Sequence, residues 1–451
     1  MLNRYLYSSV IFSAYHGLKR DRVNRARADL KASEWLPRND LVELQKDKLT
    51  RLLRFARQHV PYYSRLIEQT GLTPDVLARP EYFRMLPVLT KSVISDNTAD
   101  MVSSSLEGNS LIKNSTSGST GTALRFYTDH RSMDYRLATV IRNQEWLGVQ
   151  LHDRQVKLWG SPIDSRKNMG WKGRARELIT GVTLFSAYEM SEKRMGEYVK
   201  KIQKIKPVLL TAYPSALEVF AGYCQKNDVL IPTLKAILLS AETLWDYQRE
   251  HFTNVFRAPT YNRYGCREVG DIAHECPEHS GLHVNTERIY LELVDEAGRP
   301  CEPGEKGEIL VTDLDNYGMP FIRYRMGDFG TWVEDASTCS CGRSHPRLAS
   351  VEGRTMDVVE GANGAKIGGT FWTILLRSRV GVRKFQVVQR ESNSVDISIV
   401  PEPGLRQETL DYYTGKIREK CGSEFKINFR QVEDIKASST GKQRYIINKL
   451  K

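Results

Sequence analysis

Short β-like runs alternate with helical segments from Leu111 to about Gly353, and this alternation constrains the fold more than any other feature. Val156–Leu158, Ile237–Ser240 and Ile289–Val294 are strand-like runs of this kind. Residues from about 20 to 100 instead carry apolar side chains near helical spacing. The sequence therefore predicts an α/β body with a helical opening.

The pattern of apolar and polar residues changes again after Gly353. Residues 385–401 alternate like paired strands, residues 409–422 like a helix, and residues 425–435 like a further strand. Because 451 residues exceed what one core usually supports, two domains are expected. We predict a large N-terminal domain over 1–353, with its helical opening at 1–110, and a small α+β domain over 354–451. The boundary is placed between Val351 and Asp357.

Net charge and hydropathy limit the classes of partner that the protein is expected to bind. The net charge is +12, but the basic residues are dispersed, and the densest run, Lys19–Lys31, is interleaved with Asp21 and Asp29. This favours a solvated helical face over a nucleic-acid site. No stretch reaches the length of a membrane span. The apolar segment Tyr5–Tyr15, which precedes the basic flank, is interpreted as a helix packed on the body or as an interfacial helix at the inner membrane.

Seven cysteines without a secretory signal predict a reducing, cytoplasmic location. Cys276 and His283 precede the pair Cys339 and Cys341 by about 60 residues. Three thiolates and one imidazole would make a closed, structural tetrahedral zinc site. The alternative is a set of buried free thiols, and the spare candidates in this region are His274, His279 and Cys266.

The most informative segment is Asn114–Leu124. Two of its eleven residues are glycines and six carry hydroxyl groups. Glycine lets the backbone approach phosphate, and hydroxyl groups donate to phosphate oxygens. The strand-like flanks LIK and LRFYTD favour a hairpin-like turn over a Ser/Gly linker. No lysine follows the glycines as it does in P-loop ATPases. The predicted phosphate-binding residues are Ser117, Gly118, Ser119, Thr120, Gly121 and Thr122.

Six motifs occur in the order and rough spacing of the acyl-adenylate synthetases. They are the glycine-rich loop, SAETL (240–244), YNRYGCREVG (261–270), FIRYRMGDFG (321–330), VEGR (351–354) and SSTGKQR (438–444). HVPYYSRL, GLHVNTE and CSCGRSHPRL are further features of the phenylacetate–CoA ligase-like group. Over nearly its whole length the chain resembles that family, and most narrowly its CapK-like branch from capsule and O-antigen gene clusters.

The resemblance implies an ATP- and Mg²⁺-dependent enzyme with a small, mobile C-terminal domain. Glu268 would hold Mg²⁺ against the ATP phosphates, a role that suits a hard oxygen ligand. Tyr264 and Gly265 would lie at the adenine, the backbone of Ala241 and Glu242 would line its other edge, Asp328 would bind the ribose hydroxyls, and Arg354 would complete the nucleotide contacts. Some members of the group also carry zinc-like sites.

Lys442 matches the lysine that bridges the substrate carboxylate and the α-phosphate, where a cation offsets two approaching anions. The hinge falls near Met356 or Asp357, and Met356 departs from the charged residue usual there. Arg267 is a second departure, since it replaces a small hydroxyl residue beside Glu268. Its guanidinium could bind a carboxylate or phosphate bidentately, or it could serve as a structural ion-pair partner.

The predicted reaction is activation of a carboxylate as acyl-AMP and its transfer to an acceptor. The first expectation is an amide-forming ligase of surface-polysaccharide biosynthesis that acts on a uronic or amino acid. The alternative is an acyl–CoA ligase that uses coenzyme A, although EGANGAKIGGTFW (360–372) retains Lys366, Gly368 and Gly369 without matching the ligase segment. A catalytically inactive nucleotide-binding or interaction protein is the competing class. Monomer and homodimer both stay open.

Overall fold

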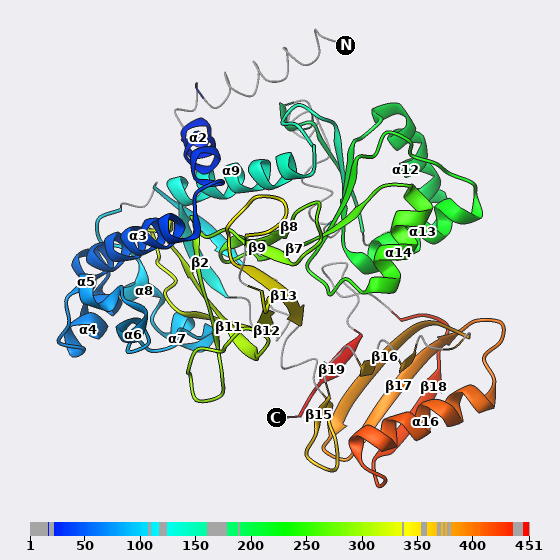
Figure 1. Cartoon of the computed structure of the whole chain (residues 1–451). Helices are drawn as coiled ribbons and strands as arrows, with labels where there is room; N and C mark the ends of the chain where they lie inside the picture. Colours follow the sequence, from blue (N-terminus) through cyan, green and yellow to red (C-terminus); the bar gives the residue numbers. More distant parts are fainter. Residues whose placement is uncertain are drawn as a thin grey trace. The chain divides into compact units, whose positions relative to one another are not determined.

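The computed structural model describes residues 22–106, 110–116, 124–159, 179–187, 190–335, 338–352, 359–367, 381–435 and 445–450, with isolated positions between these ranges. The chain divides into two compact units. The first comprises Met1–Met326 and Gly330–Val351, and the second comprises Gly327–Phe329 and Glu352–Lys451. Figure 1 shows the helices and strands of the two units, and each unit has its own hydrophobic core.

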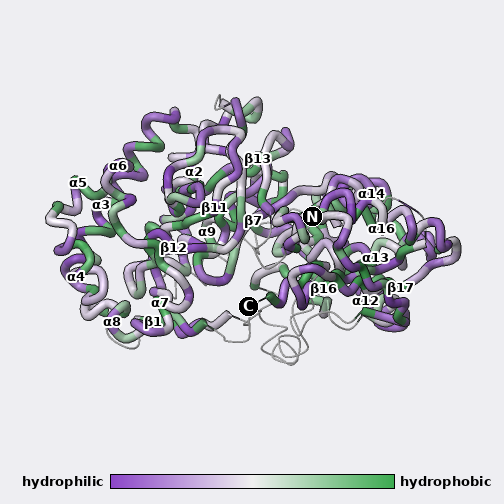
Figure 2. The backbone as a smooth tube through the Cα atoms, turned by 90° about the horizontal axis from the view of Figure 1, so that it is seen from below, coloured by the Kyte–Doolittle hydropathy of each residue, from purple (hydrophilic) through white to green (hydrophobic). Residues whose placement is uncertain are grey.

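The chain opens with helices, as the apolar spacing predicted. They are α2 (Val23–Ser33), α3 (Arg38–His59), α4 (Pro61–Gln69) and the shorter α5 (Pro74–Leu77), α6 (Pro80–Phe83), α7 (Lys91–Asp96) and α8 (Thr98–Met101). Helix α3 ends where Val60 takes an extended conformation before Pro61, as a residue before proline tends to do. Figure 2 shows hydrophilic and hydrophobic stretches alternating along these helices, which is typical of helices with one buried face.

Buried polar contacts connect this opening to the sheet. The Lys48 ammonium lies 3.0 Å from Asp315 Oδ2, and the Ser33 hydroxyl donates to Glu287 at 2.9 Å. Glu287 also accepts a hydrogen bond from the Arg142 guanidinium at 2.6 Å. Asp315 and Arg142 are almost fully buried, so these contacts are shielded from solvent. The helical opening is therefore part of the first unit's core.

The first unit is organised around an eleven-stranded sheet in the order β10-β11-β12-β13-β9-β8-β7-β6-β5-β3-β4. The strands are β3 (Gln155–Leu158), β4 (Val182–Phe185), β5 (Leu209–Ala212), β6 (Ala236–Ser240), β7 (Thr260–Cys266), β8 (Gly270–Glu275), β9 (Leu282–Val284), β10 (Ile289–Val294), β11 (Lys306–Asp313), β12 (Tyr324–Trp332) and β13 (Arg347–Glu352). Strands β4, β3, β5, β6 and β7 run parallel, whereas β7, β8, β9 and β13 pair antiparallel.

The two faces of the parallel strands differ. One face is apolar and packs against α12 (Glu192–Ile205), α13 (Pro214–Lys226) and α14 (Asp246–Phe256). The other face looks toward α9 (His130–Trp146), where Gln155 of β3 donates to Gln144 of the helix at 2.9 Å. Side chains alternate between the faces along each strand. Leu210 thus joins the apolar face, and Leu209 joins a small cluster beside the end of α9.

The predicted hairpin around the glycine-rich segment is confirmed by its flanking strands. β1 (Leu111–Ser115) and β2 (Arg125–Asp129) pair antiparallel, with Ser115 opposite Arg125. The Thr116 N–H donates to the Leu124 carbonyl at 2.9 Å, which extends the pairing to the edge of the loop. The predicted phosphate-binding residues 117–122 lie outside the described residues.

The second unit is an α+β fold, as predicted. Its four-stranded sheet has the order β18-β17-β16-β19, and a further pair is formed by β14 (Val359–Glu360) and β15 (Lys366–Ile367). The other elements are β16 (Val382–Glu391), β17 (Ser394–Pro401), α16 (Gln407–Cys421), β18 (Lys426–Gln431) and β19 (Ile446–Asn448). Its core contains Trp372, Phe385, Ile397, Tyr413 and Phe425.

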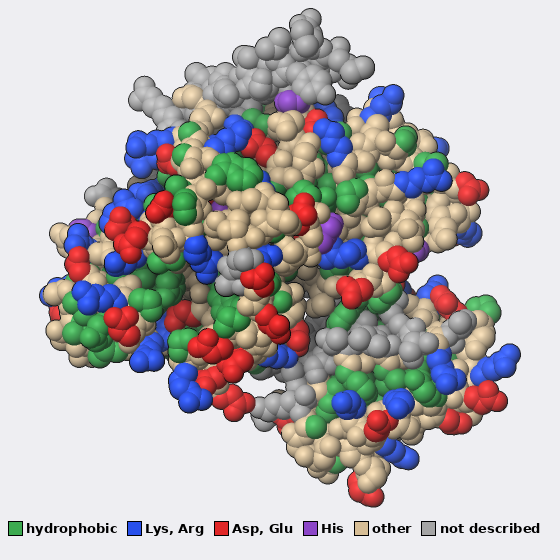
Figure 3. Space-filling model, viewed as in Figure 1, with side chains coloured by type: hydrophobic (Ala, Val, Ile, Leu, Met, Phe, Trp, Pro, Cys, Tyr) green, Lys and Arg blue, Asp and Glu red, His purple; other side chains and the backbone are tan. Residues whose placement is uncertain are grey.

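Two surface properties bear on partners. Among the described residues, no helix combines the length and apolar character that crossing a bilayer requires. On the face shown in Figure 3, Lys and Arg side chains are intermixed with Asp and Glu over the first unit. The excess positive charge thus forms no single-sign field on this face of the kind that attracts nucleic acid.

Candidate nucleotide and metal sites

The tight turn between β7 and β8 carries Glu268. Gly265 precedes the turn, and a Cβ at this position would lie 2.6 Å from the Gly270 carbonyl oxygen. Glycine is therefore required for the close approach of the two strands. The Glu268 side chain is only 7% exposed; its Oε1 accepts a hydrogen bond from the Tyr324 hydroxyl at 3.1 Å and lies 4.0 Å from Lys91 Nζ. A buried carboxylate with few neutralising partners can coordinate a hard cation.

Arg267 connects this turn to the glycine-rich segment. Its guanidinium donates to the Ser115 carbonyl at 2.8 Å, at the last residue of β1. The residue before Glu268 thus contacts the start of the loop for which phosphate binding is expected. The side chain is exposed. In this structure it makes a hydrogen bond to the backbone.

The predicted nucleotide-binding residues on β6, β7 and β12 are placed as follows. Ala241, directly after β6, has a φ of +71°, a left-handed conformation that is unusual for alanine and often found at functional sites. The Glu242 carboxylate accepts from the backbone N–H and hydroxyl of Ser215 at 2.9 and 2.8 Å, in the first turn of α13.

Tyr264 is half-buried on β7, and Asp328 is half-buried on β12. Lys442, Arg354, Met356 and Asp357 lie outside the described residues.

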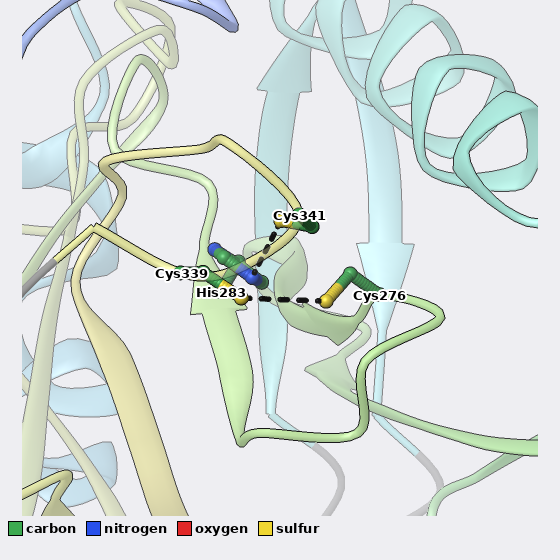
Figure 4. A group of neighbouring side chains, drawn as sticks. All are labelled: Cys276, His283, Cys339 and Cys341. Atoms are coloured by element: carbon green, nitrogen blue, oxygen red, sulfur yellow. Dashed lines mark hydrogen bonds between the residues drawn. The ribbon is translucent and has the colours of Figure 1, made fainter.

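Cys276, His283, Cys339 and Cys341 converge from three segments (Figure 4). Their ligand atoms all lie within 4.8 Å of one another; Cys276 Sγ is 3.8 Å from Cys339 Sγ, and Cys341 Sγ is 3.6 Å from His283 Nε2. Tetrahedral zinc with bonds of about 2.3 Å places neighbouring sulfur ligands about 3.7 Å apart. The donor set and its spacing therefore fit a zinc ion.

The environment of the cluster favours thiolate at one position. Burial raises the pKa of Cys276 to about 12, and the neighbouring thiols add to this. At Cys339 burial acts in the same direction, but hydrogen bonds from Ser280 and from the Cys341 backbone outweigh it and lower the pKa to about 7. Ser280 Oγ is 3.0 Å from Cys339 Sγ. Burial lowers the pKa of His283 to about 3, so its imidazole is neutral, as a metal ligand must be.

The spare candidates lie elsewhere. Cys266 contacts Met326 at 4.0 Å between sulfurs, and His279 stacks on Tyr261. His274 is fully buried, its Nδ1–H donates to the Glu275 carbonyl at 2.6 Å, and its ring packs edge-on against Trp146. Burial lowers its pKa to about 4. The four predicted residues are thus brought together without these three.

Sequence reasoning missed a clamp beside the cluster. Arg343, two residues after Cys341, is sandwiched with its guanidinium carbon 4.3 Å from the centre of the Trp146 ring and 4.4 Å from that of Trp35. The Trp146 indole donates to Glu34 at 3.2 Å, and its ring lies 5.8 Å from that of His283. The segment that carries two cysteines is thereby attached to α9 and to the helical opening.

Tyr324 and Lys91, two neighbours of the Glu268 carboxylate, were also missed. Tyr324 lies in the FIRYRMGDFG motif, four residues before Asp328, and this spacing along one strand was the available signal. Lys91 begins the short helix α7, and nothing in the surrounding sequence indicates that it reaches Glu268.

Comparison with known proteins shows which proteins this chain resembles in sequence and in fold. A family model described as the CapK C-terminal domain matches residues 359–449. Protein CapK of Staphylococcus aureus is 24% identical over 92% of this chain and 90% of its own length. A phenylacetate–coenzyme A ligase of Thermus thermophilus is 26% identical over 88% of this chain and 92% of its own. The structure of a 2-hydroxyisobutyryl-CoA ligase with its acyl adenylate superposes with a TM-score of 0.74 at 20% identity, covering 92% and 91% of the two chains.

The fold is that of the adenylate-forming ligases, with a large sheet-containing domain followed by a small C-terminal domain. Within that class, residues 359–449 match the CapK C-terminal domain, and over most of its length the chain is similar to the CapK/phenylacetate–CoA ligase-like family of adenylate-forming enzymes. The family resemblance noted in the motifs is thereby confirmed.

Proposed function

We propose that the protein activates a carboxylic acid with ATP by placing Glu268, the glycine-rich loop and Lys442 around the triphosphate. A carboxylate oxygen attacks the α-phosphorus, the bond to the bridging oxygen of the β-phosphate breaks, and pyrophosphate leaves with that electron pair. The product is an acyl-AMP mixed anhydride. Little proton transfer is needed, so electrostatic stabilisation has to supply most of the catalysis.

The observation that carries this proposal is the surroundings of Glu268. A carboxylate that is 7% exposed has a neutral hydroxyl donor, Tyr324, at 3.1 Å and a cation, Lys91, at 4.0 Å. Arg267, beside it, contacts the strand that leads into the glycine-rich loop. In this assignment Glu268 holds Mg²⁺, residues 117–122 hold the phosphates, and Ala241, Glu242, Tyr264, Gly265, Asp328 and Arg354 hold the nucleoside.

The assignment also divides the chain at 353/354 and gives the small domain a rotation that delivers Lys442 for adenylation. The hinge is assigned to Met356 or Asp357. We further assign Cys276, His283, Cys339 and Cys341 to a structural zinc ion, because four protein ligands leave no position for substrate. The protein would act in the cytoplasm or at the inner membrane surface, as a monomer or homodimer.

For the acceptor we favour an amine, so that the second half-reaction forms an amide in surface-polysaccharide biosynthesis. The CapK relative and the match of residues 359–449 to the CapK C-terminal domain support this branch. The competing acceptor is coenzyme A, which is supported by the similarity to phenylacetate–coenzyme A ligases. An amine acceptor gives an amide product and coenzyme A gives a thioester, so a single assay of the product separates the two acceptors.

The test is pyrophosphate release from MgATP with a panel of aryl, amino and uronic acids, each with and without coenzyme A or amine acceptors. Lys442→Ala should lower carboxylate-dependent release roughly 100- to 1,000-fold, the range found when one transition-state-stabilising group is removed. ATP binding should stay measurable. Lys420→Ala, in the exposed part of α16, is the matched control. Normal turnover by Lys442→Ala overturns the catalytic assignment, and ATP binding without turnover of any acid supports the inactive-protein class.

A further inference from the structure

Two buried arginines hold the main chain of the turn that carries Glu268. Arg136 of α9 donates to the Arg267 carbonyl at 3.3 Å and to the Glu268 carbonyl at 2.6 Å. Arg288, which directly precedes β10, donates to the Val269 carbonyl at 3.2 Å. Each of the three residues between β7 and β8 thus has its carbonyl bound by a guanidinium group. Carbonyls of a turn that is partly buried need such donors.

Asp313, the last residue of β11, joins the two arginines. Its Oδ2 accepts from Arg136 at 2.9 Å, and its Oδ1 accepts from Arg288 at 3.2 Å. The side chains of Arg136, Asp313 and Arg288 are 10%, 1% and 0% exposed. Charge-assisted hydrogen bonds that are shielded from water hold their geometry well. One carboxylate therefore fixes both guanidinium groups, and we call these three residues the arginine–aspartate triad.

Gly270 ends the turn and gives Arg136 the room to approach. Its φ of +80° lies in the left-handed region that favours glycine. A Cβ at this position would lie 3.1 Å from Cγ of Arg136 and 3.2 Å from its Cδ. A larger residue would strain the backbone and press on the arginine stem, so the turn and α9 fit together closely at this point.

The triad leaves the Glu268 carboxylate to other partners. Among the described residues, the hydrogen bonds of the two guanidinium groups run to backbone carbonyls and to Asp313, and none reaches the Glu268 side chain. Direct pairing with an arginine would occupy both carboxylate oxygens and neutralise their charge. The arrangement instead fixes the main chain of the turn and keeps the carboxylate able to bind a cation.

The same contacts connect the turn to both strands of the β1–β2 hairpin. Arg267 donates to Ser115, at the end of the strand that leads into the glycine-rich loop. The strand that leads out of this loop, β2, continues directly into α9, which carries Arg136. The turn with Glu268 is therefore tied to the hairpin at two points, and its place beside the hairpin is fixed before any ligand binds.

We infer that Arg136, Asp313 and Arg288 are positioning residues that hold Glu268 where it meets the metal ion of MgATP. The inference rests on the proposed function. The three residues act through the main chain of the turn, because their hydrogen bonds end on its carbonyls. Groups that orient a metal ligand strengthen metal binding, and their loss weakens it by about 10- to 100-fold. The triad should thus set the Mg²⁺ requirement of the enzyme.

The experiment is a Mg²⁺ titration of acid-dependent pyrophosphate release at saturating ATP, with the acid that gives the fastest release. Arg136→Lys keeps the positive charge, but an ammonium group lacks the planar fork that reaches two carbonyls and Asp313 together. The Mg²⁺ concentration for half-maximal release should rise about 10-fold. The rate at saturating Mg²⁺ should stay within about 3-fold of the parent rate, since the metal ligand itself is retained.

Arg142→Lys is the matched control, because Arg142 lies on the same helix, is 1% exposed and pairs with Glu287 away from the turn. It should keep the parent Mg²⁺ requirement even where its thermal midpoint falls. Asp313→Asn is a second test variant; it removes the charge that holds both guanidinium groups and should raise the Mg²⁺ requirement as Arg136→Lys does. If Arg136→Lys does not fold, Asp313→Asn decides.

An unchanged Mg²⁺ requirement in the test variants, with only the thermal midpoint lowered, shows a purely structural triad; this result overturns the inference and leaves the proposed function standing. An equal rise in Arg142→Lys shows general loosening of the core and overturns it as well. If the parent protein releases no pyrophosphate with any acid, the proposed function fails and the inference fails with it.

Discussion

The Arg343 guanidinium lies over the Trp146 indole, with 4.3 Å between its central carbon and the ring centre. Arg343 comes two residues after Cys341, and Trp146 ends α9. This contact therefore joins the cysteine-bearing segment to the helix that covers the sheet.

Arg343→Met should lower the free energy of unfolding of the first unit by about 2 kcal/mol, the value of a desolvated cation–π contact. Arg343→Lys should retain only part of this stabilisation, because an ammonium group stacks poorly on an indole. Chemical denaturation followed by tryptophan fluorescence measures both. Arg299→Met, at an exposed ion pair, should stay within about 0.5 kcal/mol of the parent protein. Equal effects of the Arg343 and Arg299 variants would contradict the clamp.

The purified protein should carry one zinc ion per chain, and Cys339→Ser should lower the zinc content well below one, because a closed site needs all four ligands. Elemental analysis together with the thermal midpoint checks this. Cys224→Ser is the control, since that thiol is also buried but lies on α13, in the apolar core that this helix forms with the sheet. Removal of zinc by a chelator should also change the fluorescence of Trp146, which lies beside His283. Metal-free protein with an unchanged midpoint speaks against a structural ion.

Tyr324→Phe removes the hydroxyl that donates to Glu268 and should raise the Mg²⁺ concentration needed for half-maximal pyrophosphate release by about 10-fold, as loss of a partner of a metal ligand does. A Mg²⁺ titration at saturating ATP measures this. Tyr413→Phe, which loses a comparable buried hydrogen bond in the second unit, should show the parent requirement. If both variants behave alike, Tyr324 has no part in orienting Glu268.

Glu287 links stability to pH. Burial alone would raise its pKa, but the Arg142 and His345 side chains outweigh burial and hold the pKa well below its usual range. A depressed pKa stabilises the fold above the unfolded-state pKa of about 4.3, and this stabilisation is lost as pH falls through the folded-state pKa. Glu287→Gln should therefore cost about 3 kcal/mol at pH 7, and the difference from the parent should shrink below about pH 4. A difference that is constant from pH 7 to pH 3 would show that the carboxylate charge is not the cause.

The α/β body and the hairpin were predictable because their signals are local. The alternation of apolar residues marks strands such as Ile289–Val294, and the strand-like flanks of the glycine-rich loop indicated that they would pair. The four members of the Cys/His cluster could be predicted from residue type and sequence position. The geometry of the cluster could not, because it depends on β13 pairing with β9 across about 60 residues, which brings the Cys339–Cys341 segment to His283.

Residues whose role depends on register could not be read from the sequence. Arg263 and Asp271 form an ion pair at 3.3 Å only because β7 and β8 pair in one register, and a shift by one residue would send each side chain to the other face. Lys91 reaches Glu268 from a helix about 180 residues earlier in the chain. Such contacts are fixed by tertiary packing and leave no local pattern.

The bond between Lys48 and Asp315 spans 267 residues. On a ribosome that adds 5 to 20 residues per second, the opening helices wait roughly 13 to 53 s before that partner is even synthesised. Until then the sheet whose strands share a core with the apolar side chains of α3 is incomplete. We therefore expect nascent chains of this protein to expose an apolar helical surface for a long time before the fold can close over it.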